Sequence, residues 1–193
     1  MAYTPKILAF AGSLRKDSYN KKLVKIAIAG AEEAGAKVTY LDLRDYPLPV
    51  FDEDLEAAEG MPANGRAIKD LMLAHDGWLL SCPEYNSSIT AVLKNTIDWA
   101  SRKEGDEKPL ECFAGKVVTL MSASPGALGG LRGLVTVRSI LGNIQMIVLP
   151  EQAAIPGAGD AFNADGTLKD AQKAAQVRGL GANLAKVLAK LRG

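Results

Sequence analysis

Short apolar runs that alternate with segments of helical apolar spacing limit most strongly how this chain can fold. The runs predict strands at residues 6–11, 37–43, 77–82, 117–121 and 146–149, several of them buried on both faces. Helices are expected at residues 18–35, 65–74, 89–100, 128–141 and 168–191. Because parallel strands need crossover connections and these are usually helical, the alternation predicts one doubly wound α/β sheet.

Proline and glycine mark the expected breaks between these elements. Pro150 is expected to stop the fifth strand, and residues 151–166 are expected to form the one long irregular segment after the sheet. Residues 45–50, with two prolines, predict a stiff connection after the second strand. In sheets of this kind, ligands bind beyond the carboxyl ends of the strands. The loops after the first, third and fourth strands are therefore the expected place for chemistry.

Composition excludes several functions for a chain of 193 residues, which we expect to form one domain over residues 1–193. The formal charge of +1 gives no field that would attract nucleic acid or an anionic membrane. No apolar stretch has the length to span a bilayer, and the start lacks a secretory pattern. Cys82 and Cys112 form no metal or disulfide motif, so we expect reduced thiols and a cytoplasmic location, and the single histidine, His75, excludes a histidine-rich metal site.

The loop after the first strand, residues 12–20, has the character of an anion site. It follows a buried strand and opens a helix, whose free N–H groups suit a phosphate. Ser13, Ser18 and Asn20 add polar donors, and Arg15 adds a planar cation. The loop carries neither the Walker A motif nor the GxGxxG fingerprint. A capped turn without a ligand, with Ser18 as N-cap, is the alternative interpretation.

The loops after the third and fourth strands could hold a flat heterocycle. Residues 83–88 include Tyr85, a flat apolar face with a polar tip, and Asn86, whose amide could read a ring edge. Ser87 or Ser88 could cap the next helix, and Glu84 could be only a solvated carboxylate. Residues 122–130 are rich in small residues, which favours close approach by a ligand or by another backbone.

These loops contain no obvious pair of base and nucleophile. A serine hydrolase would need a histidine, and His75 is expected near the opposite end of the sheet. The scarcity of acid–base groups favours a bound cofactor as the reactive species, so no catalytic side chain is assigned.

Two sequence motifs resemble those of the NAD(P)H-dependent FMN reductases, which include bacterial quinone and chromate reductases. GSLRKDSYN at residues 12–20 is similar to the phosphate loop of that family, and PEYN at 83–86 with LKNTIDW at 93–99 is similar to its second signature. The resemblance extends from residue 6 to about residue 166. It implies a flavodoxin-like three-layer sandwich with a five-stranded parallel sheet of order 2-1-3-4-5.

The resemblance also implies a cofactor, FMN, and a co-substrate, NADPH or NADH. Residues of the first loop should hold the phosphate and ribityl chain, and residues of the other two should border the isoalloxazine ring. The implied cofactor-binding residues are Ser13, Arg15, Ser18, Tyr19, Asn20, Pro83, Glu84, Tyr85, Asn86, Ser124 and Gly126. No metal site is expected. The family implies a homodimer or homotetramer with the flavin near the subunit interface.

The expected reaction is hydride transfer from NAD(P)H to the flavin, then reduction of a quinone, free flavin, azo compound or metal oxyanion. Family members usually carry Pro-Gly after the PEYN serine, where this chain has residues 88–92, so the acceptor preference stays open. Arg15, Lys16, Lys103 and Arg132 are all candidates for a contact with a 2′-phosphate. Two alternatives remain: a flavodoxin-type electron carrier, which the near-neutral charge disfavours, and a non-enzymatic binding module on the same fold.

Overall fold

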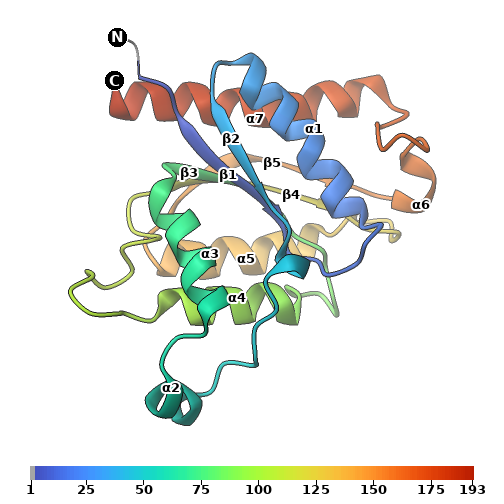
Figure 1. The fold of residues 1–193 in the computed structure, drawn as a ribbon. Coiled ribbons are helices and arrows are strands. Elements are labelled where there is room, and N and C mark those ends of the chain that lie inside the picture. Colours follow the sequence, from blue (N-terminus) through green and yellow to red (C-terminus); the bar gives the residue numbers. More distant parts are fainter. Residues whose placement is uncertain (1–2) are drawn as a thin grey trace.

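Five parallel strands form the centre of the molecule in the computed structural model, which describes residues 3–193 (Figure 1). The strands are β1 (Lys6–Ala11), β2 (Lys37–Leu41), β3 (Gly77–Ser81), β4 (Val117–Ala123) and β5 (Ile147–Ile155). Their order in the sheet is β2-β1-β3-β4-β5, and every neighbouring pair is parallel. The predicted fold class and strand order are confirmed.

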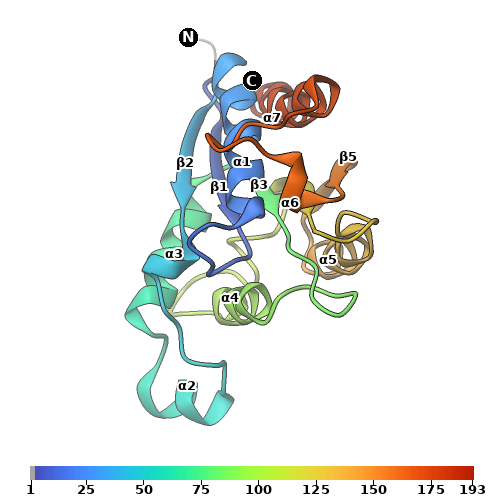
Figure 2. The same cartoon turned by 90° about the vertical axis from the view of Figure 1, so that its right-hand side faces the viewer.

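Helices cover both faces of this sheet. The α-helices are α1 (Tyr19–Glu33), α2 (Glu53–Glu59), α3 (Ala63–Ala74), α4 (Ala91–Ser101), α5 (Leu131–Asn143), α6 (Ala158–Ala161) and α7 (Ala171–Arg192). A 3-10 turn, η1 (Leu43–Asp45), follows β2. Helices α1 and α7 lie on one face, and α3, α4 and α5 lie on the other (Figures 1 and 2). None of the helices in residues 3–193 combines the length and the apolar character that crossing a membrane requires.

The alternation of side chains along the strands divides the core into two halves. Ile7 and Ala9 of β1 face α1 and α7, whereas Leu8 and Phe10 face the other three helices. The second half includes the fully buried rings of Phe10, Trp78 and Phe113, and the ring of Trp78 meets that of Phe10 edge to face at 5.6 Å. Such pairs contribute about 1 kcal/mol beyond the area that they bury.

Two glycines let α1 and α7 pack with their backbones in direct contact. A Cβ atom on Gly30 of α1 would overlap the carbonyl oxygen of Arg178, and one on Gly181 of α7 would overlap that of Ala27. Glycine inside a helix costs about 1 kcal/mol relative to alanine. The close approach explains why these two positions tolerate that cost.

The fifth strand corrects the prediction that it would stop at Pro150. Strand β5 continues through this proline to Ile155, with a shift in its pairing to β4 between Val118 and Leu120. Because β5 lies at the edge of the sheet, it has a side without a neighbouring strand, where the missing N–H of a proline costs no ladder bond. Residues 151–166 are therefore not one irregular segment, since they include the end of β5 and the short α6.

The start of α5 also differs from the prediction, and α2 was not predicted at all. Helix α5 begins at Leu131 and not at residue 128, because Gly129 and Gly130 have φ angles of 61° and 91°, outside the helical region. Helix α2 lies in the stretch after the proline-bearing connection, where no helix was predicted. It buries none of its residues, so it has no apolar pattern by which it could be found.

Candidate functional site

The loops that follow β1, β3 and β4 meet at one cavity, because these strands are neighbours in the sheet and all end at the same edge. The cavity lies between β1 and β3, where the order of the strands switches: β2 is on one side of β1, and β3, β4 and β5 follow on the other. Its lining residues are Ser13, Arg15, Ser18, Tyr19, Asn20, Pro83, Glu84, Tyr85, Ala123, Ser124 and Pro125. The structure therefore brings together all the predicted site residues except Asn86 and Gly126, which lie beside the cavity in the same loops.

The first loop presents hydroxyl groups and a cation toward the cavity. Ser18 occupies the N-cap position of α1 as predicted, but its side chain forms no capping hydrogen bond. The Ser13 hydroxyl accepts a hydrogen bond from the backbone N–H of Arg15 at 3.3 Å. The Arg15 guanidinium lies 5.7 Å from the ring centroid of Tyr19 and has no ion-pair partner in the described part of the chain. These groups are therefore available to a ligand.

Asn20 joins the ends of three elements through its side-chain amide. Its Nδ2 donates to the carbonyl oxygen of Ala123 at 2.8 Å. Its Oδ1 accepts from Ser81 Oγ at 2.8 Å and from the backbone N–H of Ala123 at 3.0 Å. The residue is buried, so these bonds fix α1 against the carboxyl ends of β3 and β4. The position of the first loop relative to the loops after β3 and β4 therefore depends on this amide.

The second loop is a tight turn that places Tyr85 on the surface. Tyr85 and Ser88 exchange two backbone hydrogen bonds of 3.0 Å across Asn86 and Ser87. Both central residues have positive φ angles, 52° and 66°, as a type I′ turn requires. More than half of the Tyr85 side chain is exposed, so its ring forms an open wall of the cavity.

Thr90 caps the following helix, and the prediction that Ser87 or Ser88 would do so is wrong. The Thr90 hydroxyl accepts a hydrogen bond from the Leu93 N–H at the start of α4. The same hydroxyl donates to the carbonyl oxygen of Gly12 at 2.7 Å. Thr90 therefore connects α4 to the first loop, a link between residues 78 positions apart that no local pattern indicates.

Glu84 is bound inside the protein and is not a solvated carboxylate. Its Oε2 accepts from the backbone N–H of Gly133 at 3.0 Å, and its Oε1 lies 3.4 Å from Nε of Arg132. Both partners belong to the first turn of α5, where a negative charge is favourable. Glu84 thus holds the second loop against α5.

The small residues of the third loop serve contacts within the protein. A Cβ atom on Gly130 would overlap the Ser122 hydroxyl, and one on Gly129 would meet the backbone of Ile155 at 2.7 Å. The Ser122 hydroxyl in turn donates to the carbonyl oxygen of Cys82 at 2.6 Å. Of the two explanations for these glycines, close approach by another part of the chain holds at both positions.

Phe162 supports the site from outside the three predicted loops. Its ring stacks on that of Tyr19, with centroids 5.8 Å apart and planes inclined by 12°. Sequence reasoning missed this residue together with Ala123 and Pro125. Phe162 lies after the last strand and carries no motif, so only the fold brings it to Tyr19.

The remaining reactive side chains lie away from the cavity. His75 follows the end of α3, where its ring nitrogens contact the Leu71 carbonyl oxygen at 2.6 Å and the Thr39 hydroxyl at 2.8 Å. Burial raises the pKa of the Cys82 thiol and raises that of Cys112 to about 12, so neither is a ready nucleophile. Within residues 3–193, no group of three or more His, Cys, Asp or Glu side chains is placed to hold a metal ion.

The donors around the cavity fit a phosphate-bearing flavin. Hydroxyl groups, an unpaired guanidinium and the first N–H groups of α1 converge there, and the one carboxylate in the lining is turned toward α5. Tyr85 and Pro83 add flat or apolar surface beside this anion cradle. Flavodoxin-like proteins bind FMN at this switch between β1 and β3, so a cradle of this kind is typical of the flavin-binding class of that fold.

Comparisons with known proteins specify this class further. The family of NADPH-dependent FMN reductases matches residues 5–160. An NAD(P)H-dependent FMN reductase of Pseudomonas aeruginosa is 36% identical over 166 residues, which cover 86% of this chain and 85% of that protein. A quinone reductase of Pseudomonas putida is 34% identical over 88% of each chain. A solved structure of the flavoenzyme FerB, an NAD(P)H:(acceptor) oxidoreductase of Paracoccus denitrificans, is 30% identical in sequence and superposes with a TM-score of 0.80. The match covers 97% of this chain and 98% of FerB.

The chain belongs to the NADPH-dependent FMN reductase family, an NAD(P)H-dependent group of flavin oxidoreductases. The family resemblance that its two motifs predicted is thereby confirmed.

Proposed function

We propose that this chain binds FMN in the cavity and passes electrons from NADPH or NADH to a quinone, free flavin, azo compound or metal oxyanion. The observation that carries the proposal is an anion cradle without a neutralising carboxylate, at the switch between β1 and β3. The family membership and the quinone reductases among the relatives also support it. Bound FMN would supply the exchange of two electrons between nicotinamide and acceptor.

We assign the phosphate end of FMN to the first loop. Ser13 and Ser18 would donate hydroxyl hydrogen bonds to it, and Arg15 would contribute its charge and planar donors. Tyr19 would form the wall behind them, supported by Phe162. Asn20 would act mainly as a positioning residue, because its amide is already bonded to β3 and β4.

The ring of FMN would extend beyond this cradle. The cavity holds about 60 Å³, which is enough for the phosphate end but not for the isoalloxazine. We therefore place the ring over Pro83, Tyr85 and Asn86 on one side and over Ser124 and Gly126 on the other. Glu84 would keep the second loop in place through Gly133.

The test begins with the purified protein, which is incubated with FMN, desalted and examined by absorption spectroscopy. Anaerobic NADPH and then NADH follow. We expect a retained flavin band that bleaches with a reduced nicotinamide. A retained band that neither nucleotide bleaches would indicate the alternative, a flavodoxin-type electron carrier. If no flavin is retained and a titration shows no binding, the proposal fails in favour of a binding module.

We propose that a second copy of the chain covers the open side of the ring site, in a homodimer or homotetramer. Tyr85, Leu128, Leu131 and Val135 are all at least 42% exposed, and the last two lie one helical turn apart on α5. An apolar group of this kind beside a ligand site is typical of an interface. The second copy would cover the open side of the isoalloxazine ring and so complete its pocket.

Sedimentation velocity tests this assembly. We expect the wild-type protein to sediment as a dimer or tetramer and Val135→Asp to shift it toward the monomer with weaker FMN binding. Val50→Asp is the matched control, because Val50 is exposed on the connection before α2. A monomeric wild-type protein would contradict the proposal. We also propose a cytoplasmic location, since Cys82 and Cys112 are buried free thiols.

A further inference from the structure

A second, larger cavity lies on the other side of the first loop. It is a groove of about 560 Å³ between α1, the end of β2 and the segment that leads from α6 into α7. A volume of this size is typical of sites for small molecules. Ser18 lines both this groove and the cofactor cavity, so the two openings are adjacent.

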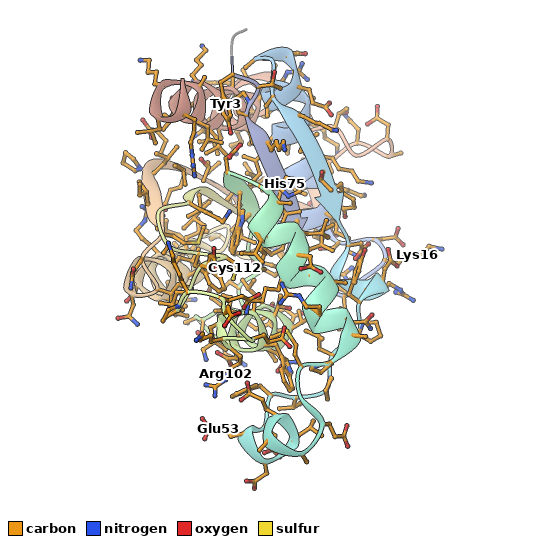
Figure 3. The ribbon with its side chains drawn as sticks, turned by 60° about the vertical axis from the view of Figure 1, so that its left-hand side comes forward. Tyr3, Lys16, Glu53, His75, Arg102 and Cys112 are labelled. Carbon is orange, nitrogen blue, oxygen red and sulfur yellow. The ribbon has the colours of Figure 1, made fainter. Side chains whose placement is uncertain are left out.

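Three lysines along this groove have no carboxylate partner in the described part of the chain. They are Lys16 in the first loop, which points outward in Figure 3, and Lys22 and Lys25 on α1. Lys22 Nζ lies 5.9 Å from the ring centroid of Tyr19, and Lys25 Nζ lies 5.3 Å from that of Tyr40. Contact with an aromatic ring stabilises an ammonium group but leaves its charge uncancelled.

The other charges of the groove are already engaged. Lys21 is buried and pairs with Asp42 at 2.6 Å, and Arg178 pairs with Glu33. The carboxylate of Asp165 accepts hydrogen bonds from the N–H and the hydroxyl of Thr167. Asp17, exposed in the first loop, and Asp165, which has no cationic partner in the described part of the chain, are the unpaired negative charges of the lining, against the three unpaired lysines. The groove is thus positive along α1.

The same groove offers apolar surface beside the lysines. The ring of Tyr40 lines it at the end of β2, and Ile26, Leu168 and Ala174 line it on the helical side. A flat aromatic face with nearby ammonium groups suits a heterocycle that carries phosphate. A purine nucleotide has this chemistry.

We propose that this groove binds the adenosine end of NADPH, with the 2′-phosphate held by Lys22 and Lys25. The inference rests on the proposed reductase function, which requires a nicotinamide nucleotide beside the flavin. The shared wall at Ser18 lets one extended molecule contact both the groove and the cofactor cavity. Lys22 and Lys25 then determine the preference for NADPH over NADH.

Calorimetry on the FMN-loaded protein tests the groove without turnover, using adenosine 2′,5′-bisphosphate and 5′-AMP as probes. We expect the bisphosphate to bind at least tenfold more tightly than 5′-AMP, since each charge-assisted hydrogen bond adds roughly that factor. The double variant Lys22→Gln/Lys25→Gln should lose this difference. The control is Lys186→Gln/Lys190→Gln, which changes the same charge on the exposed side of α7.

Kinetics provide the second measurement. The groove variant should raise the KM for NADPH at least tenfold, while the KM for NADH and both kcat values stay unchanged. Equal bisphosphate binding by wild type and groove variant, or equal binding of the two probes by the wild type, would overturn the proposal. Bisphosphate binding that depends on the two lysines in a protein whose flavin NADPH does not reduce would support the groove and refute the reductase function.

Discussion

Two groups of charged side chains in this molecule differ in how completely they are paired. The first group lies where α3 meets residues 102–116. There the buried Lys69 pairs with Glu107, and Arg66 also contacts Glu107, at 2.6 Å. Arg102 pairs with Glu56 of α2 at 2.8 Å and lies near Glu53 (Figure 3). Around the first loop and α1, by contrast, cations such as Arg15 lie against aromatic rings.

The paired charges stabilise the fold, whereas the unpaired charges are available to bind a ligand. The paired group joins α2, α3 and the segment after α4. The unpaired group would gain its carboxylate or phosphate partner from outside. Each of the following predictions alters one group, and the first two also measure whether the other group responds.

The largest effect is expected from Lys69→Met in the paired group. Lys69 is 2% exposed and donates to Glu107 and to the carbonyl oxygen of Arg102. Loss of one partner of a buried pair costs about 3 kcal/mol, which should appear in urea unfolding followed by circular dichroism. FMN affinity should stay unchanged. Lys108→Met, at an exposed position of the same segment, is the control, and equal stability of the two variants would argue against the structural role.

Arg15→Gln should show the opposite pattern. Removal of one charged donor should weaken FMN binding roughly 30-fold, or about 2 kcal/mol, in a fluorescence titration. The stability of the FMN-free protein should change by less than about 0.5 kcal/mol, because Arg15 is exposed there. A variant that unfolds more readily without FMN but binds it normally would place Arg15 in the group that builds the fold.

Glu107→Gln breaks the Lys69 pair from its other side, and its effect on stability should depend on pH. Burial opposes ionisation of Glu107, but hydrogen bonds from Lys69 and Arg66 lower its pKa from 4.5 to about 2. A lowered pKa in the folded state stabilises the protein above the unfolded pKa, and this contribution is lost as pH falls through the folded pKa. The stability difference between wild type and variant should therefore be full at pH 7 and shrink between about pH 4.5 and 2. A pH-independent difference in thermal unfolding would contradict it.

Patterns that are local in the sequence predicted most of the sheet and the place of the site. The apolar runs at β1, β3 and β4 and the polar loops after them are contiguous, so periodicity and loop composition were enough. Pro150 was misjudged because its tolerance depends on β5 being an edge strand, which is a property of the sheet. The contact of Glu84 with Gly133 and the stacking of Phe162 on Tyr19 were not predicted, since they depend on how distant elements pack.

The backbone contact between α1 and α7 has a consequence for how the protein is made. Helix α7 comes after all five strands in the chain, yet it covers one half of the core, including Ile7 and Leu79. A ribosome therefore releases the strands well before the helix that covers them. Until α7 docks through Gly30 and Gly181, this apolar face is exposed to chaperones and to other nascent chains.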